Sequence, residues 1–215
     1  MSLSTTTSHP YLSRNLIPSR HLNLMGTIKK SEVNGPGCRA VVWVQGCARA
    51  CGSCFNPASW EFEINQLVSI DQVVELILSE PSHEGVTFSG GEPFWQATAL
   101  AEVARQVKAH GLNVMSFSGF TLDELQSDRA PAGAHDLLQE LDLLIDGPYV
   151  ESQAINDPTS LVSSRNQKVR IFNEAMRDRL NWASDQIEIH ILPDGSRIVT
   201  GYLGSLNPLS AEVAE

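Results

Sequence analysis

The sequence predicts an α/β fold in which strands and helices alternate along the chain. Short β-rich runs are separated by segments in which apolar residues recur at helical spacing. Capping-box patterns mark the start of two of these helical segments. Small and polar residues follow the ends of the strands. Alternation of this kind is typical of parallel βαβ units.

The length and composition fit a single globular domain. The chain has 215 residues, of which 42% are hydrophobic and 19% are charged. A chain of this kind is long enough to bury a core and does not have a disordered composition. Because the start is rich in Ser, Thr and Pro, we expect a flexible lead-in over residues 1–25. One domain is expected over residues 26–215, including a C-terminal extension over about 174–215.

The individual elements are expected in the following order. Strands are predicted over residues 40–44, 85–88, 114–117, 141–145 and 168–172. One helix follows the capping box of Ser69 and Gln72, a second spans 97–110 before Gly111, and a third follows the capping box of Thr121 and Glu124. Residues 187–191 and 197–202 flank Asp194-Gly195, which predicts a β-hairpin extension.

The residues that follow the predicted strands indicate where a site lies. The first strand leads into Cys47, the second into Ser89-Gly90-Gly91-Glu92-Pro93, the third into Ser118 and the fourth into Asp146. In a parallel sheet the carboxyl ends of the strands share one side, where α/β and barrel enzymes place their sites. We therefore expect these residues to lie together.

The charge and hydropathy of the chain exclude some classes of partner. Acidic residues outnumber basic ones by 25 to 15, giving a net charge of −10, which argues against non-specific binding of nucleic acid. The sequence contains no apolar run long enough for a membrane span. Its start, MSLSTTTSHPYLSRN, lacks the apolar segment of a signal peptide. A cytoplasmic protein without a nucleic-acid or membrane partner is expected.

Four cysteines lie between positions 38 and 54, and three of them have the spacing C-x3-C-x2-C. These three are Cys47, Cys51 and Cys54. Such thiolates suit zinc or an iron–sulfur cluster, and three of them would leave one iron of a four-iron cluster open. Two alternatives remain open: a redox dithiol of Cys51 and Cys54, and a zinc site completed by Cys38 or a distant His. Otherwise Cys38 is expected to be a small buried hydrophobic residue.

These motifs together resemble the radical S-adenosylmethionine (SAM) superfamily. More narrowly, the chain resembles the activating enzymes of anaerobic ribonucleotide reductase and related glycyl radical enzymes, of the 4Fe-4S single cluster domain type. The matching stretches lie in order between about residues 27 and 173. They are Asn34-Gly-Pro-Gly37, Trp43-Val-Gln-Gly-Cys47, Cys54-Phe-Asn-Pro57 with Trp60, Ser89-Gly-Gly-Glu-Pro93, Ser118-Gly-Phe-Thr-Leu-Asp-Glu-Leu125, Ile145-Asp-Gly-Pro148 and Asn166-Gln167.

The resemblance implies a fold, two cofactors and a reaction. The fold would be a partial (β/α) barrel of the radical SAM type, in which Cys47, Cys51 and Cys54 hold a [4Fe-4S] cluster. SAM would bind the open iron and be cleaved reductively to a 5′-deoxyadenosyl radical, which abstracts hydrogen from the substrate. No side chain beyond the cluster and SAM is expected to react. The implied partners are a glycyl radical enzyme as protein substrate and a flavodoxin or ferredoxin as electron donor.

The expected SAM-binding residues lie at the strand ends and after the cysteines. They are Asn56, Ser89, Gly90, Gly91, Glu92, Ser118 and Asp146, with Asn166 and Gln167 matching a pair near the site. Gly90 and Gly91 would let the backbone approach the ligand, and Glu92 would accept from the methionine ammonium. The alternatives are a tight turn with an exposed Glu92, a turn held by Ser118, and Asp146 as a cap of the following segment.

The chain departs from the resembled pattern in ways that bear on its substrate. Gly52-Ser53 stands where the ribonucleotide reductase activators usually have Gly directly before the last cysteine, and residues 162–165 replace the usual Arg-Gly-Ser. Two other functions therefore remain open: a radical SAM enzyme acting on a peptide or small molecule, and a non-enzymatic zinc or iron–sulfur module. For an acidic electron donor, a local basic patch of Arg39 and Arg49 near the cluster is expected.

Overall fold

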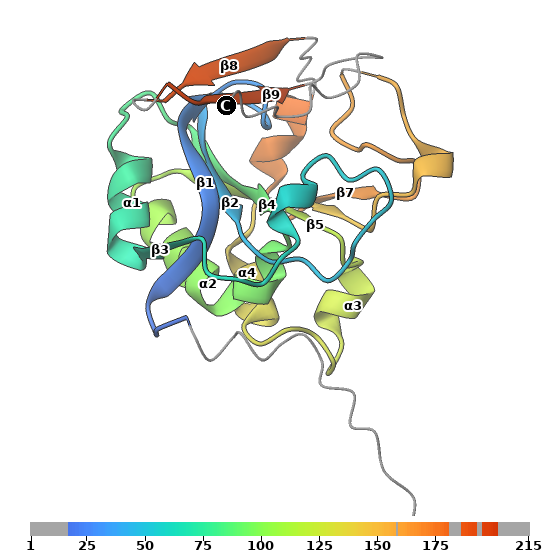
Figure 1. Cartoon of the computed structure of the whole chain (residues 1–215), viewed down its shortest axis with the longest axis horizontal. Coiled ribbons are helices and arrows are strands. Elements are labelled where there is room, and N and C mark those ends of the chain that lie inside the picture. Colours follow the sequence, from blue (N-terminus) through green and yellow to red (C-terminus); the bar gives the residue numbers. More distant parts are fainter. Residues whose placement is uncertain (1–16, 158, 181–185, 193–194, 202–215) are drawn as a thin grey trace, which may run out of the picture.

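The computed structural model describes residues 17–157, 159–180, 186–192 and 195–201. Seven strands form one mixed sheet, and α-helices cover one of its faces (Figure 1). The predicted α/β class is confirmed. The edges of the sheet are β3 and β7, and the described strands do not close into a barrel.

The sheet has the strand order β3-β1-β2-β4-β5-β6-β7. Its four central strands β2, β4, β5 and β6 are parallel, whereas β1, β3 and β7 run antiparallel to their neighbours. The bounds are β1 (His21–Ser31), β2 (Arg39–Val44), β3 (Gln66–Ser69), β4 (Gly85–Gly90), β5 (Asn113–Ser118), β6 (Leu143–Asp146) and β7 (Lys168–Ile171). The parallel strands bring their carboxyl ends to one side of the sheet, as predicted.

The three predicted helices begin where the sequence places them. Both capping boxes are confirmed, with Ser69 and Gln72 starting α1 and Thr121 and Glu124 starting α3. The α-helices are α1 (Ile70–Leu78), α2 (Ala97–Lys108), α3 (Leu122–Gln126) and α4 (Ala134–Glu140). Short 3-10 helices are η2 (Pro57–Ser59), η3 (Pro93–Gln96), η4 (Glu151–Gln153) and η5 (Glu174–Leu180). None of the helices among the described residues is long and apolar enough to cross a membrane.

The two faces of the sheet are buried differently. Val114 and Leu144 belong to a large apolar cluster that includes residues of α1, α2 and α4. Their neighbours Met115, Leu143 and Ile145 belong to a smaller cluster together with Met176 of η5. Because successive side chains of a strand point to opposite faces, the helices cover one face and η5 covers only part of the other.

The structure corrects three details of the predicted elements. β1 begins at His21, so residues 21–25 belong to the sheet and not to the expected lead-in. The fourth predicted strand begins at Leu143 instead of residue 141. There the Asp142 carboxylate accepts a hydrogen bond from the Val114 N–H (2.8 Å), which makes the residue a polar junction before the strand. The strands β1 and β3 and the helix α4 were not predicted.

The predicted C-terminal hairpin is confirmed, although Asp194 of its turn lies outside the described residues. It consists of β8 (Ile187–Ile191) and β9 (Arg197–Gly201), paired antiparallel. Glu188 accepts from the Glu32 N–H (2.7 Å), and Thr200 donates to Asn34 Oδ1 (3.0 Å). These contacts fix the hairpin beside the loop that connects β1 and β2 (Figure 1).

Candidate cofactor site at the carboxyl ends of the parallel strands

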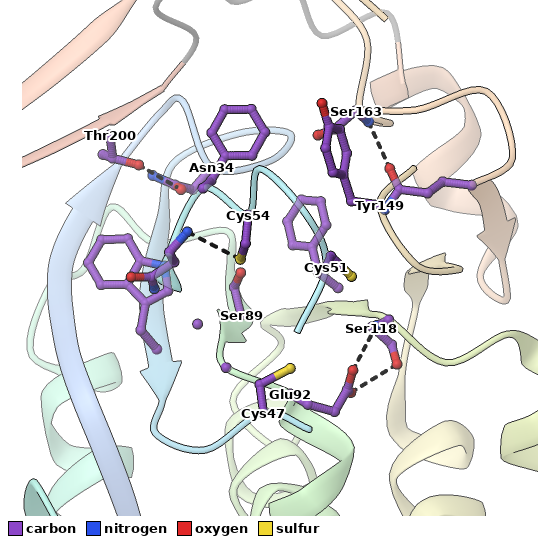
Figure 2. A pocket seen from close by; sticks show the side chains of 18 of the residues that line it. Asn34, Cys47, Cys51, Cys54, Ser89, Glu92, Ser118, Tyr149, Ser163 and Thr200 are labelled. Carbon is purple, nitrogen blue, oxygen red and sulfur yellow. Dashed lines mark hydrogen bonds between the residues drawn. The ribbon is translucent and has the colours of Figure 1, made fainter. Parts of the chain in front are cut away.

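A pocket of about 470 Å³ lies where the parallel strands end. Its walls include Trp43, Ser89 and Phe117, which alternate along their strands with residues of the helix-covered face. The pocket therefore occupies the sheet face opposite the α-helices. Figure 2 shows the labelled cysteines, Ser89 and Ser118 around it. The pocket thus lies at the carboxyl ends of the parallel strands, where the sequence places the site.

The cysteine loop, residues 47–54, begins directly beyond β2 and reaches across the pocket. Cys47, Cys51 and Cys54 all line it and approach it from different sides (Figure 2). Among the described residues, no three Cys, His, Asp or Glu side chains are gathered ready for one metal ion. The three thiols therefore surround the pocket and are too far apart to bind a single metal ion in this arrangement. Cys38, at the other end of β2, lies outside the pocket lining and has its sulfur 3.6 Å from Ser82 Oγ.

The start of the cysteine loop is held by backbone hydrogen bonds. The Gly46 N–H donates to the Ser59 carbonyl (2.8 Å), and the Cys47 N–H donates to the Trp60 carbonyl (2.9 Å). Burial raises the pKa of the Cys47 thiol to about 11. The thiol is thus protonated at neutral pH, and a bound metal has to displace that proton.

The two glycines at the end of β4, Gly90 and Gly91, are required by the packing of the chain itself. A Cβ at Gly90, whose φ is +96°, would lie 2.6 Å from the Val44 N. A Cβ at Gly91 would lie 2.4 Å from the Gly46 carbonyl oxygen. The expected reason for these glycines was approach of the backbone to a ligand. The structure gives a second reason, because the ends of β4 and β2 approach each other too closely for a side chain. Both glycines also line the pocket, and approach to a ligand there stays a prediction.

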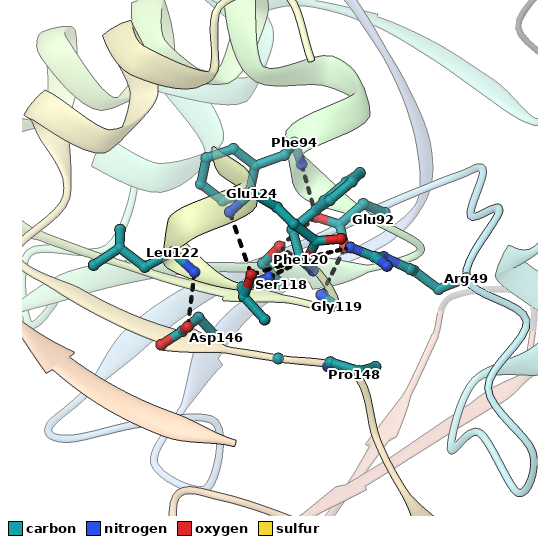
Figure 3. A network of polar contacts seen from close by, with 12 residues as sticks. Arg49, Glu92, Phe94, Ser118, Gly119, Phe120, Leu122, Glu124, Asp146 and Pro148 are labelled. Carbon is teal, nitrogen blue, oxygen red and sulfur yellow. Dashed lines mark hydrogen bonds and ion pairs between the residues drawn. The ribbon is translucent and has the colours of Figure 1, made fainter. Parts of the chain in front are cut away.

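Glu92 is buried, with an exposed fraction of 1%, which excludes the alternative of an exposed turn residue. Its Oε1 accepts from Ser118 Oγ (2.9 Å) and the Phe94 N–H (3.1 Å), while Oε2 accepts from the Gly119 N–H (2.7 Å) (Figure 3). Burial raises the pKa of Glu92 to about 7, although these hydrogen bonds oppose the shift. The carboxylate thus links the ends of β4 and β5, and its contact with an ammonium stays a prediction.

Ser118 and Asp146 each accept a hydrogen bond from a backbone N–H group. Ser118 Oγ accepts from the Phe120 N–H (3.0 Å) and so holds the turn after β5. Asp146 is buried, accepts from the Leu122 N–H (2.8 Å) and pairs with Arg170 (2.7 Å). It caps the start of α3 and not the segment that follows it. Asp146 is not among the described residues that line the pocket, and its expected contact with SAM stays a prediction.

Of the remaining predicted residues, three line the pocket and Asn166 does not. Asn56 and Ser89 line the pocket, and Asn56 Nδ2 contacts Met25 Sδ (3.0 Å). Gln167 also lines it, and its side chain binds the Ser163 N–H (2.9 Å) and the Gly147 carbonyl (3.1 Å). Asn166 is not among the described lining residues and donates to the Pro148 carbonyl (2.7 Å).

Parts of the pocket wall were not predicted from the sequence. Residues 198–201 of β9 and Tyr149 line the pocket. Phe55 lines it too and is 70% exposed. A signal for Phe55 existed in its position directly after the last cysteine. The hairpin carried no comparable signal, because its place over the pocket depends on distant contacts.

The expected basic patch of Arg39 and Arg49 does not form. Arg39 is fully buried, so it offers no surface to an electron donor. Arg49 pairs with Glu124 (2.8 Å) and lies over the Phe120 ring, 4.0 Å from its centroid (Figure 3). Its Nε is buried and has no hydrogen-bond partner within the described part of the chain.

The residues present fit an iron–sulfur cluster with a small organic ligand. Three soft thiols face one pocket, and its volume of about 470 Å³ lies within the usual range for small-molecule sites. The buried Arg49 Nε on its wall is a donor to which a bound acceptor could be matched.

Comparisons with known proteins agree with this fit. The 4Fe-4S single cluster domain family matches residues 33–170. The anaerobic ribonucleoside-triphosphate reductase-activating protein of Haemophilus influenzae is 33% identical over 161 residues, which cover 70% of this chain and 99% of that protein. Its counterpart from phage T4 is 30% identical over 123 residues, covering 54% of this chain and 74% of that protein.

A further relative is named for a different enzyme, a lyase. The pyruvate formate-lyase-activating enzyme of Staphylococcus epidermidis is 39% identical over 87 residues, which cover 38% of this chain and 35% of that enzyme. The resemblance drawn from the motifs is confirmed by these matches. The chain therefore belongs to the 4Fe-4S single cluster domain family of radical SAM activating enzymes, whose cofactors are a [4Fe-4S] cluster and S-adenosylmethionine.

Proposed function

We propose that this enzyme activates a glycyl radical enzyme, with Cys47, Cys51 and Cys54 as the ligands of its cluster. When bound, the cluster and SAM supply one-electron cleavage of a sulfonium bond and hence a radical that abstracts hydrogen. The observation that carries the proposal is the placement of these three thiols around one pocket at the strand ends. Three thiols leave a position open for SAM, which argues against a closed structural zinc site.

In this proposal the residues of the chain bind the cluster and SAM and form the wall around them. Gly90 and Gly91 form part of the wall beside the cysteine loop, and Asn56 and Ser89 contribute polar groups. Glu92, held by three donors, keeps the end of β4 fixed against β5. The neighbouring side chains Trp43, Phe55 and Phe117 supply an apolar part of the wall, as is usual for a site that holds a small organic ligand.

We further propose that the sheet is the partial (β/α) barrel of radical SAM enzymes. The support is its open form and the single helical layer, which leave the pocket face accessible to a large substrate. A cytoplasmic location and a flavodoxin or ferredoxin as reductant belong to the same proposal.

The reaction is tested by anaerobic reconstitution with iron and sulfide, followed by SAM and dithionite. We expect 5′-deoxyadenosine from the wild-type chain and none above background from Cys47→Ala. Cys38→Ala is the matched control and should retain the activity, because Cys38 lies outside the pocket lining. Equal product from the wild-type and Cys47→Ala chains would contradict the proposal.

The substrate is tested separately with a purified glycyl radical enzyme. The anaerobic ribonucleoside-triphosphate reductase of Haemophilus influenzae is the first choice, since its activating protein is 33% identical to this chain. A glycyl radical signal in electron paramagnetic resonance spectra is the expected result. Formation of 5′-deoxyadenosine without that signal would instead favour a peptide or small-molecule substrate.

A further inference from the structure

The cysteine loop contains a strained residue directly before its last thiol. Ser53 has a φ of +57°, in the left-handed region that residues with a Cβ rarely adopt. The loop's own glycine, Gly52, does not take up a positive φ. Strain of this kind persists only where surrounding contacts determine the conformation. Some contact of Ser53 must therefore oppose the relaxation of the loop.

That contact is a hydrogen bond to a carboxylate far along the chain. Ser53 Oγ donates to Glu151 Oε1 at 2.6 Å. A hydroxyl that donates to an ionised carboxylate forms a short and strong bond, about twice as strong as one between neutral groups. The bond forms with residue 53 left-handed, so it stabilises this conformer relative to the relaxed ones.

Glu151 is a fixed point from which the loop can be held. It begins η4, and the chain segments on either side of the turn that follows η4 are joined by hydrogen bonds. The Arg165 N–H donates to the Gln153 carbonyl (2.9 Å), and the Val150 N–H donates to Ser164 Oγ (3.2 Å). A tether to this segment therefore restrains the cysteine loop relative to the body of the protein.

A second contact lies beside the hydrogen bond. The Phe55 and Tyr149 rings meet edge to face, with centroids 6.1 Å apart. Cys54 lies between Ser53 and Phe55, so both of its neighbours are bound to the segment that follows β6. The first half of the loop is held elsewhere, by Arg49 and Glu124.

We propose that the Ser53–Glu151 hydrogen bond is a positioning device that keeps residue 53 left-handed and so directs the Cys54 thiol into the pocket. The inference rests on the proposed function, because it takes Cys54 to be a cluster ligand. Ser53 and Glu151 are positioning residues and need not touch SAM or substrate.

The test measures how fast the reconstituted holoprotein loses iron to the chelator EDTA under anaerobic conditions. Ser53→Ala and Glu151→Ala should each lose iron about tenfold faster, which corresponds to about 1.4 kcal/mol for a lost hydrogen bond to a charged group. Ser53→Gly should stay within about threefold of the wild type, because glycine adopts a positive φ without steric cost. Glu151→Gln keeps the acceptor oxygen, so its rate of iron loss should also stay within about threefold of the wild type.

Two controls separate this effect from general destabilisation. Ser82→Ala removes a comparable exposed hydrogen bond, from Ser82 Oγ to Glu80 Oε1 (2.8 Å), and should leave iron loss unchanged. The double variant Ser53→Ala/Glu151→Ala should lose iron no faster than either single variant, since both remove the same bond.

Each contrary result overturns the inference in a recognisable way. If Ser53→Ala retains iron like the wild type, the hydrogen bond positions nothing. If Ser53→Gly loses iron as fast as Ser53→Ala, or the double variant shows additive effects, the left-handed conformation is not what the bond maintains. A wild-type chain that takes up no iron overturns the proposed function as well, whereas iron uptake with unaffected variants overturns this inference alone.

Discussion

A cysteine and an arginine lie at or just beyond each end of strand β2, and the two pairs have different surroundings. At its amino end, Arg39 is fully buried and Cys38 lies near Ser82. Beyond its carboxyl end, Cys47 lines the pocket, and Arg49 keeps about a quarter of its side chain exposed. We call the amino end, where the arginine is buried, the closed end, and the carboxyl end beside the pocket the open end. The cysteines are half-buried at both ends and differ in whether they line the pocket.

The difference between the regions is whether the chain supplies partners. Arg39 donates to Thr87 Oγ1 (2.7 Å), Asn113 Oδ1 (2.9 Å) and the carbonyls of Val86 (3.1 Å) and Pro36. Arg49 has one ion pair, and its buried Nε lacks a partner among the described residues. A polar group that the fold satisfies itself has a structural role, whereas one left unsatisfied beside a pocket is available to a ligand.

The largest expected effect separates the two cysteines. Cys47→Ala should abolish iron and sulfide uptake on reconstitution, because a cluster ligand is lost, while Cys38→Ala should bind as much as the wild type. Iron and sulfide analysis of the purified proteins measures this. Loss of iron in Cys38→Ala would show that the closed end of β2 contributes to the metal site, as in the zinc alternative.

The next effect concerns the buried arginine. Burial lowers the pKa of Arg39 to about 10, so the guanidinium stays charged at neutral pH. Arg39→Met would leave several buried acceptors without a donor, and should reduce the free energy of unfolding by about 3–5 kcal/mol. Urea unfolding followed by circular dichroism measures the change. A cost below about 1 kcal/mol would contradict the structural role assigned to the amino end.

Glu92 gives a smaller and pH-dependent effect at the open end. Its pKa of about 7 in the folded chain exceeds the ordinary value of 4.5, so the folded state binds the proton more tightly. The contribution of Glu92 to stability is therefore present at low pH and is lost as pH rises from about 4.5 to about 7. A shift of this size corresponds to about 3 kcal/mol.

The Glu92 effect is isolated by comparison with Glu92→Gln, which does not titrate. Urea unfolding of both apoproteins between about pH 5 and about pH 8 should show wild-type stability falling relative to the variant. Glu124→Gln serves as the matched control, since Glu124 is part exposed at the same end. A difference between wild type and Glu92→Gln that does not change with pH would show that Glu92 is ionised throughout.

The sequence predicted the side of the sheet on which the site lies, because strand ends are a local signal. Cys47, Gly90 and Ser118 each follow a β-rich run, and parallel topology brings such ends together. β1 was missed because its residues 21–31 mix charged, polar and apolar types without a clear period, and only pairing with β2 and β3 makes them a strand.

The partners of the site residues were less predictable than their positions. The sequence places Glu92, Ser118 and Asp146 at strand ends but does not indicate which distant N–H groups they meet. Asp146 lies beside Leu122 and Arg170, which are 24 residues away in either direction. Close contacts such as those of Gly91 with Gly46 likewise depend on the spacing of neighbouring strands, which no local pattern encodes.

The smallest expected effect belongs to the arginine at the open end. Arg49→Gln loses an ion pair in which Glu124 is 46% exposed, so the free energy of unfolding should fall by less than about 1 kcal/mol. Urea unfolding measured beside Arg39→Met provides the direct contrast. A loss as large as that of Arg39→Met would mean that the open end is as rigidly built as the closed one. A small loss together with weaker SAM binding would instead show that Arg49 contributes to ligand binding and little to stability. The bound ligand would then complete the contacts of Arg49, as it would for the cysteines beside it.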